Sequence, residues 1–280
     1  MWLLAALSTT FCFGVNNTLF KWGTTRKLSK EWIQFFFYLV AFLLVLLYGV
    51  FRHALHPNYL ALLMGGLTGI LNANGNLQMT KAFEKGPASI TSTLIAMNSV
   101  VVVLATALFF PESIPMIHWL GIVIMIVSAI VVQYQPGNKT RFEYKPWLLR
   151  CTFSLVSIGS VGVLLKVAAY KQINFIDMLF FMYGGGLMFL SVLVRGEIMR
   201  LTAHKTEIKV ATIVGFLSTI GFGCYLFALK TGPASIVFPI ISLNCLVVMI
   251  SGLFLFKERL RTYQLIGMAT ALLGLVLTKI

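Results

Sequence analysis

Gly86-Pro87-Ala88-Ser89-Ile90 returns 146 residues later as Gly232-Pro233-Ala234-Ser235-Ile236. At the same offset and without a gap, residues 75–134 and 221–280 share 14 identities in 60 positions, and many other pairs are apolar on apolar. Chance produces scattered identities rather than an unbroken block of five with collinear flanks. The sequence is therefore interpreted as an internal duplication, the signature of a repeat architecture.

The composition is that of a polytopic membrane protein. Of the 280 residues 59% are hydrophobic and only 11% are charged, whereas soluble domains carry about 25% charged residues. The net charge of +14 does not predict nucleic-acid binding, because the basic residues lie singly or in small groups between apolar runs. Orientation in a membrane and attraction to anionic lipid explain them better. We expect a multi-pass protein in the lipid bilayer of a bacterial inner (plasma) membrane.

Ten apolar runs have the length of about 20 residues with which an α-helix crosses a bilayer. They divide the chain into a first repeat, 1–134, a polar linker, 135–146, and a second repeat, 147–280. The runs are roughly 2–22, 32–51, 58–81, 87–110, 115–134, 147–170, 174–194, 208–230, 233–256 and 262–279. The predicted fold is all-α with ten transmembrane helices, because backbone groups in lipid must be hydrogen-bonded within their own segment.

Each half holds an odd number of spans, so the second half enters the membrane from the opposite face. The repeats are therefore inverted, with a pseudo-two-fold axis in the membrane plane. Two such halves can exchange conformations and open a central site to one side and then to the other, which favours a transporter. Some channels are built in the same way, and that alternative stays open.

The repeated turn and its flanks resemble the drug/metabolite transporter superfamily, and within it the EamA type. The resemblance rests on the Gly-Pro-Ala-Ser-Ile turn between the third and fourth spans, on Glu112 and Glu258 at the ends of the fourth spans, and on the last span from Gly267 through Gly274. It covers the whole chain. It implies a ten-helix secondary carrier of small metabolites, often an exporter, and leaves the substrate open.

Amide side chains inside the spans are the first candidates for substrate binding. Polar residues at this depth usually face the interior of the bundle. Each could be a hydrogen bond between helices, worth on the order of 0.6 kcal/mol, but eight amides exceed what packing needs and predict an aqueous central cavity. Amides bind uncharged or zwitterionic solutes without imposing a charge. The eight are Asn74 and Gln78 together with the six that are predicted to bind the substrate, which are Asn16, Asn17, Asn72, Asn76, Asn98 and Asn244.

Lys166 and Tyr225 complete the predicted substrate site. Lys166 corresponds to Lys21 at an offset of 145, and both lie near the ends of their spans. Such lysines can extend to the head groups, or face the cavity and attract a carboxylate or phosphate. Tyr225 is either an anchor at the membrane interface or part of the site.

The two turns and one further proline are predicted hinges or gates. Gly86 and Gly232 are expected to end their helices in a left-handed conformation, while Pro87 and Pro233 open the next helices at the first position. Pro239 is expected to kink the ninth span, because proline removes a backbone hydrogen bond. A purely structural role is the alternative for all five.

Acidic residues are expected at the ends of the spans rather than inside them. Glu112 and Glu258 should cap the next helix or pair with a nearby base such as Arg261. The inner parts of the spans contain no acid, which disfavours proton antiport driven by a buried carboxylate.

The basic residues are unevenly distributed between the two faces of the membrane. Of the 22 lysines and arginines, 17 lie on the face opposite the termini. The positive-inside rule then puts both termini outside the cytoplasm, whereas the resemblance implies cytoplasmic termini, and the orientation stays open.

The favoured function is export of a small polar, amino-acid-like metabolite, with a coupling ion or counter-substrate, by a monomer or homodimer. The alternative is a flippase or exchanger for a lipid-linked or phosphorylated sugar, which would need a lateral opening and a phosphate-binding lysine. An enzyme is not expected, because HExxH, GxSxG and paired mid-membrane aspartates are missing from the sequence. No cofactor or metal is expected, since the four cysteines lie in apolar runs without CxxC spacing.

Overall fold

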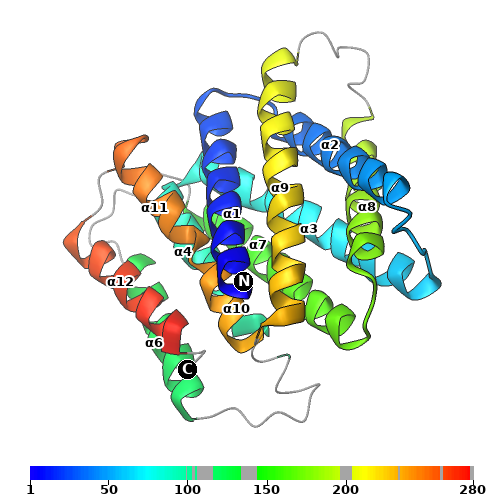
Figure 1. Ribbon diagram of the computed structural model, residues 1–280. Helices are drawn as coiled ribbons and strands as arrows, with labels where there is room; N and C mark the ends of the chain where they lie inside the picture. Colours follow the sequence, from blue (N-terminus) through cyan, green and yellow to red (C-terminus); the bar gives the residue numbers. More distant parts are fainter. Residues whose placement is uncertain are drawn as a thin grey trace.

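The computed structural model describes residues 1–98, 100–102, 105, 116–133, 144–195, 204–232, 234–258 and 261–277. Within these ranges every regular element is a helix (Figure 1). The first half contains α1 (Trp2–Thr25), α2 (Lys30–Phe51), α3 (Tyr59–Lys85), α4 (Ala88–Ala96) and α6 (Met116–Gln133). The second half contains α7 (Tyr144–Tyr170), α8 (Phe175–Val194), α9 (Lys205–Thr231), α10 (Ala234–Ser242), α11 (Asn244–Phe254) and α12 (Thr262–Leu277). The second half thus begins inside the predicted linker, whose residues 135–143 lie outside the described ranges.

Three helices begin after a polar residue whose side chain accepts a hydrogen bond from a backbone amide of the first turn. The Ser29 side chain accepts a hydrogen bond from an amide of the first turn of α2, Asn58 does so for α3 and Asn174 for α8. These caps satisfy amide groups that have no partner within the helix. They explain why α2 begins at Lys30, two residues before the apolar run.

Five of the described helices, α1, α2, α7, α8 and α9, are long and apolar enough to cross a membrane. Helix α3 has 27 residues, but its asparagines lower the hydropathy below that of the others. The least apolar of the long helices is therefore the one that carries four of the eight amides.

The helix contacts are the same after the two halves are exchanged. Helix α3 packs against α7 and α8, and its counterpart α9 packs against α1 and α2. Two further pairs each join one half to the other: α4 packs against α11, and α6 packs against α12 at one edge of the molecule (Figure 1). Most of the large interfaces therefore lie between the halves, so neither half forms the core alone.

Glycines allow the backbones of α3 and α8 to touch. A Cβ atom added at Gly69 would overlap the carbonyl oxygen of Met182, and one added at Gly185 would lie 2.6 Å from the carbonyl oxygen of Gly66. Backbone cannot move aside as a side chain can. Small residues of this kind let membrane helices approach closely, and here they fix the crossing of the two halves.

The two predicted helix-ending glycines are not left-handed. Gly86 has φ −155° and Gly232 has φ −126°, both in extended backbone, so the expectation of a left-handed cap is wrong. Glycine is required for space instead. An added Cβ would lie 2.5 Å from the indole nitrogen of Trp147 at Gly86, and 2.7 Å from the Trp2 ring at Gly232.

The prolines also differ from expectation. Pro87 is the residue before α4 and not its first helical residue, while Pro233 lies outside the described ranges. Helix α10 continues through Pro239 and ends at Ser242. The span breaks four residues after Pro239, and the kink at Pro239 itself stays a prediction.

Both fourth spans break at the same repeat position. Helix α4 ends before Met97, and α10 ends before Leu243, 146 residues further on. At each break a tight i to i−3 bond forms, from the Met97 amide to Leu94 and from the Leu243 amide to Ile240, both at 3.2 Å. The first half has no proline here, so the break belongs to the repeat and not to Pro239.

The backbone contact at Gly69 predicts different effects on stability for two neighbouring substitutions. Gly69→Ala should destabilise the protein by about 1–3 kcal/mol, the usual cost of overpacking, whereas Gly66→Ala should not, because an added Cβ there meets nothing within 4 Å. The measurement is the midpoint of thermal unfolding in detergent for the two variants. Equal midpoints would show that α3 and α8 do not touch at Gly69.

Candidate functional site

A cavity of about 120 Å³ lies between the halves. Seven of the eight predicted substrate-binding residues line it; these are Asn16, Asn17, Asn72, Asn76, Asn98, Tyr225 and Asn244. The eighth, Lys166, is not among the lining residues, although its neighbour Leu165 is. Residues scattered over more than 200 positions of sequence thus meet at one place.

The helical spacing of the lining residues repeats in the two halves. On α3 the residues at positions 72, 76 and 79 face the cavity, and on α9 those at 218, 222 and 225 do so. Each triplet follows the i, i+4, i+7 spacing of one helix face, and the second is the first displaced by 146. Applying the repeat offset to Asn72 and Asn76 would have found Ser218 and Phe222, which the sequence analysis missed.

The equivalent positions differ in chemistry. Helix α1 presents Asn16 and Asn17 where α7 presents Val161 and Gly162. Helix α3 likewise presents two asparagines where α9 presents Ser218 and Phe222. The cavity is therefore symmetric in its backbone, but its amide wall comes mostly from the first half.

The two amides at the breaks of the fourth spans have matching hydrogen bonds. The Asn98 side chain donates to the Ile95 carbonyl, and the Asn244 side chain donates to the Ile241 carbonyl, each at 2.8 Å. A side-chain donor thus serves a carbonyl where the helix is interrupted. Each amide nitrogen thus uses one of its two N–H groups at the break, and the other N–H and the side-chain oxygen stay available for further hydrogen bonds.

Two further amides bond across the cavity wall. Asn17 donates to the side-chain oxygen of Asn244 at 3.4 Å, joining α1 to α11. Asn72 donates to the hydroxyl of Tyr38 at 2.7 Å, joining α3 to α2. Tyr38 is fully buried, so this bond orients an amide at the cavity from behind.

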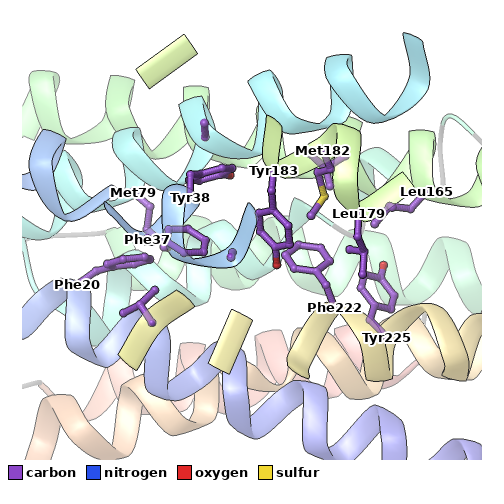
Figure 2. Close-up of a cluster of buried hydrophobic side chains, with 14 of the residues drawn as sticks. Phe20, Phe37, Tyr38, Met79, Leu165, Leu179, Met182, Tyr183, Phe222 and Tyr225 are labelled. Atoms are coloured by element: carbon purple, nitrogen blue, oxygen red, sulfur yellow. The ribbon is translucent and has the colours of Figure 1, made fainter. Parts of the chain in front are cut away.

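An aromatic wall lines the same cavity as the amides. Phe13, Phe222, Tyr225 and Phe238 form it, with ring centroids 4.8 Å apart for Phe13 and Phe222 and 6.0 Å apart for Tyr225 and Phe238. Figure 2 shows Phe222 and Tyr225 side by side, with Tyr183 next to them. Tilted and edge-on rings of this kind form a stable apolar surface.

The described lining contains no acidic, basic or histidine side chain. A net-charged solute would therefore lose its hydration without a counter-charge, which costs several kcal/mol. The cavity suits an uncharged or zwitterionic solute with a polar and an apolar side.

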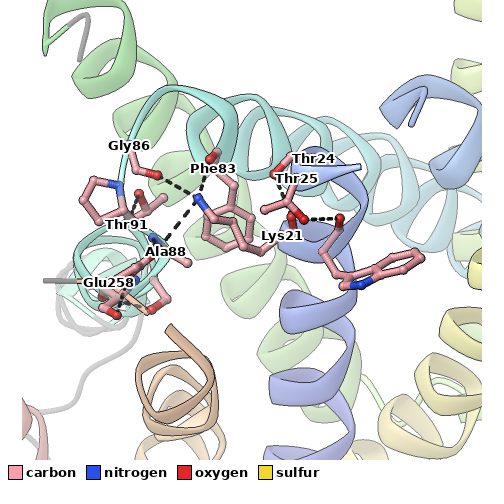
Figure 3. Close-up of polar contacts among 12 residues, drawn as sticks. Lys21, Thr24, Thr25, Phe83, Gly86, Ala88, Thr91 and Glu258 are labelled. Carbon is pink, nitrogen blue, oxygen red and sulfur yellow. Dashed lines mark hydrogen bonds and ion pairs between the residues drawn. The ribbon is translucent and has the colours of Figure 1, made fainter. Parts of the chain in front are cut away.

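Charge is found instead at one end of α4, in what we call the Glu258 cap. The Glu258 carboxylate accepts hydrogen bonds from the amides of Ala88 at 2.6 Å and Ser89 at 3.0 Å, and from the Ser89 hydroxyl at 2.6 Å (Figure 3). Glu258 does cap a helix, as expected, but the helix belongs to the other half. Its basic neighbour is Lys21, not Arg261.

Lys21 completes the Glu258 cap. Its ammonium lies 3.9 Å from the carboxylate and donates to the carbonyls of Phe83 at 2.8 Å and Gly86 at 3.1 Å. Only 12% of its side chain is exposed, so Lys21 does not extend to the head groups as one of its two expected roles requires. The carboxylate also lies at the N-terminus of α4, which is the positive end of that helix dipole. Hydrogen bonds, the helix dipole and the ammonium of Lys21 therefore all stabilise Glu258 of the second half in its place at α4.

Comparison with known proteins identifies the family to which this architecture belongs. The model of the EamA-like transporter family matches residues 1–134 and 145–280. The chain belongs to this family. The EamA match confirms the resemblance and the predicted fold, a multi-pass integral membrane protein of ten helices in two inverted repeats. At the level of the family, the EamA protein is a transporter and not an enzyme.

A curated relative and a solved structure show what this chain is similar to. The relative is the "Probable 4-amino-4-deoxy-L-arabinose-phosphoundecaprenol flippase subunit ArnE" of Proteus mirabilis (strain HI4320), 36% identical over 77 residues. That match covers 27% of this chain and 66% of the relative, just under two thirds. A crystal structure described only as that of a protein has a TM-score of 0.66 over 96% of both chains, at 13% identity, which shows the fold alone.

Cysteine labelling distinguishes a cavity that water fills from one that is closed. In a variant whose four cysteines are replaced by alanine, Ser242→Cys should react with a small water-soluble thiosulfonate, because Ser242 lines the cavity. Ser154→Cys is the matched control, since Ser154 is fully buried and lies outside the lining. The measurement is the mass shift of the intact protein over time. Equal rates would contradict a water-filled cavity.

Proposed function

We propose that this EamA-family protein is a secondary-active transporter that exports a small uncharged or zwitterionic polar metabolite, of amino-acid-like size and polarity. The observation that carries the proposal is the neutral cavity, which is lined by six amides and lies between two inverted halves. Amides exchange hydrogen bonds with a polar solute and offset the water it loses. Their neutrality also lets the solute leave, because no strong ion pair must break.

Alternating access follows from the way in which the halves share the walls. Helices α1 and α9 pack against each other, as do α3 and α7, and each of these pairs joins one half to the other at the cavity. A rocking motion of one half against the other would open the cavity to one face and close it to the other, as inverted repeats allow. The breaks beside Asn98 and Asn244 give each fourth span a place to bend.

The Gly-Pro-Ala-Ser turns are the proposed gates. At one face the Glu258 cap joins the turn at Gly86 and Pro87 to the second half, so opening this face requires the carboxylate to leave α4. By repeat symmetry, the turn at Gly232 and Pro233 is the proposed gate at the opposite face. The proposed hinge of the ninth span is the segment from Pro239 to the break at Leu243.

A lipid-linked or phosphorylated-sugar flippase is the second candidate. It is favoured by the name of the relative from Proteus mirabilis, which states a phosphoundecaprenol-linked sugar. The neutral lining argues against a phosphate in the cavity, since phosphate sites normally use arginine or lysine. Lys21 is the basic group in the Glu258 cap, and Lys166 remains the second proposed contact for an anionic group.

The export proposal is tested by comparing metabolite pools. Cells that express the wild-type protein should accumulate one class of polar compound outside, and cells with Asn98→Ala/Asn244→Ala at equal membrane abundance should not. The double variant removes two cavity oxygens and the donors that hold the breaks. The measurement is mass spectrometry of the medium and of the cell extract.

Two outcomes would overturn this assignment. Identical pools in both strains would remove the support for export through these amides. Translocation of a fluorescent phosphoprenyl sugar across proteoliposomes by the wild-type protein, without solute export, would favour the flippase.

The Glu258 cap predicts a shift between open and closed conformations. Glu258→Gln keeps the shape and removes the charge, so the closed state should lose about 1 kcal/mol of helix-dipole and ion-pair stabilisation. Each 1.4 kcal/mol is tenfold in a population, so the open state should become about fivefold more populated. The measurement is the rate at which an impermeant thiol reagent, added at the face of Lys21, modifies Ser242→Cys in proteoliposomes.

Glu84→Gln is the matched control for this change. Glu84 pairs with Lys30 at 2.7 Å at the same end of α3, but 35% of its side chain is exposed, and exposed pairs contribute about 0–1 kcal/mol. Equal labelling rates in Glu258→Gln and Glu84→Gln would show that the Glu258 cap does not close this face.

A further inference from the structure

A chain of hydrogen bonds joins α3 to α7 outside the cavity. Arg150 on α7 donates to the side-chain oxygen of Gln78 at 2.7 Å, and Gln78 donates in turn to the side-chain oxygen of Asn74 at 3.2 Å. The Asn74 side chain then donates to the hydroxyl of Ser157 at 2.9 Å, back on α7. We call these four residues the Arg150 seam. They do not line the cavity, so they are not part of the proposed substrate site.

The other half of the molecule contains the same helix crossing. Where α7 crosses α3, the Ser154 hydroxyl donates to the Gly75 carbonyl at 2.9 Å. Where α1 crosses α9, the Thr9 hydroxyl donates to the Gly221 carbonyl at 3.0 Å. The two bonds are equivalent by the repeat offsets of 145 and 146, so each crossing is held by a hydroxyl at the same place.

The Arg150 seam is present in only one of the two crossings. Its positions are occupied by small or apolar residues in the other crossing. Arg150, Gln78, Asn74 and Ser157 correspond to Ala5, Cys224, Ile220 and Cys12. Since α1 and α9 pack without such a chain, the polar groups of the Arg150 seam have a task other than holding two helices together.

The long side chains of the Arg150 seam lie at the edge of the surface that contacts lipid. Those of Asn74, Gln78 and Arg150 are half-buried. Arg150 follows Leu149, which is exposed on α7. On α3, Asn74 and Gln78 follow the exposed Ile70 at intervals of four residues, so they continue one stripe of the helix. A ligand of the Arg150 seam would therefore approach from the bilayer.

Arg150 carries a positive charge that no acid balances within the described part of the chain. Its polar partner there is the neutral Gln78, which uses one of the five N–H groups of the guanidinium. A charged side chain in the hydrocarbon is costly unless it is paired. Arg150 is the seventh residue of α7 and lies about 9 Å along it. Because helical side chains slope toward the N-terminus, its guanidinium points toward the head groups where α7 begins.

We propose that the Arg150 seam binds the phosphate of an anionic phospholipid from the surrounding bilayer. A guanidinium matches two phosphate oxygens with parallel N–H groups, and Gln78, itself held by Asn74, fixes its orientation. The acyl chains lie along the exposed Leu149 and Phe153 of α7. The face at which α7 begins carries 17 of the 22 basic residues, and such a face attracts anionic lipid.

Native mass spectrometry of the full chain in detergent tests this site, because it counts bound lipids and protein copies together. The probes are dioleoylphosphatidylglycerol, dioleoylphosphatidylcholine and inorganic phosphate. The wild type should retain one phosphatidylglycerol in preference to phosphatidylcholine. Arg150→Gln should weaken that binding about tenfold to a hundredfold, the range for hydrogen bonds to a charged group. Without added lipid, Arg150→Gln should unfold at the same temperature as the wild type, since the equivalent crossing has Ala5 at this position.

Lys209→Gln is the matched control. Lys209 is exposed on α9, which begins at the same face of the membrane, and its replacement removes the same charge from a different helix. It should leave the binding of phosphatidylglycerol unchanged.

Four results would overturn the lipid site. Three of them are equal losses in Arg150→Gln and Lys209→Gln, equal retention of the two lipids by the wild type, and displacement of phosphatidylglycerol by inorganic phosphate at equal concentration. The fourth is a wild-type homodimer that Arg150→Gln dissociates, because a second copy of the chain would then cover the Arg150 seam.

Discussion

The direct contact between the backbones of α3 and α8 is the constraint on which the rest of the structure depends. Lipid offers no hydrophobic drive to bring two apolar helices together, so close packing must supply the attraction. Gly69 and Gly185 provide it by removing the atoms that would hold the backbones apart. The position of α3 then fixes Asn72 and Asn76 at the cavity, and Tyr38 on α2 orients Asn72 from behind. A side chain in the crossing would move both amides.

The same physics explains why charge lies at the Glu258 cap and not in the cavity. A helix that starts inside a membrane protein exposes amide groups that neither water nor lipid satisfies. Glu258 satisfies those of Ala88 and Ser89, and Lys21 partly balances the carboxylate. The cap therefore stabilises the conformation in which it forms, and opening it leaves buried amides and a buried carboxylate without their partners. Such a contact can separate two conformations without touching the solute.

The sequence predicted the amides of the site well, because a polar residue in an apolar run has few places to go other than the interior of the bundle. It also predicted the helices, since apolar length and the exact repeat both indicate them. Of the aromatic wall it predicted Tyr225 but not the three phenylalanines. Phe222 and Phe238 look like any apolar residue until the neighbouring helices are known, although the repeat offset from Asn76 would have identified Phe222. The sequence also did not exclude Lys166 from the cavity lining, because the position of a residue along a span does not reveal which way its helix face turns.

The errors at the turns have a common cause. Gly86 was expected to serve the conformation of its own backbone, but it makes room for Trp147, which is 61 residues away. The break of the ninth span was not predicted: it lies at Leu243, in register with Met97 of the other half, and not at Pro239, where a kink was expected. In both cases the prediction used a rule for a single helix. The structure is determined instead by a contact between the halves, for Gly86, and by the repeat, for the helix break. Glu258 follows the same pattern, since the helix that it caps belongs to the other half.

The difference in chemistry between the two symmetric walls has a consequence for transport. If the halves exchange conformations, the backbone of the cavity is similar before and after, but the amides of α1 and α3 remain with the first half, whereas three of the four rings of the aromatic wall, those on α9 and α10, remain with the second. A solute held by its polar end to the first half and by its apolar end to the second would keep both contacts as the halves rock. Its binding energy would then be nearly equal in the two conformations. A solute bound equally in both states does not favour either one, so it can be released at the opposite face without a large barrier.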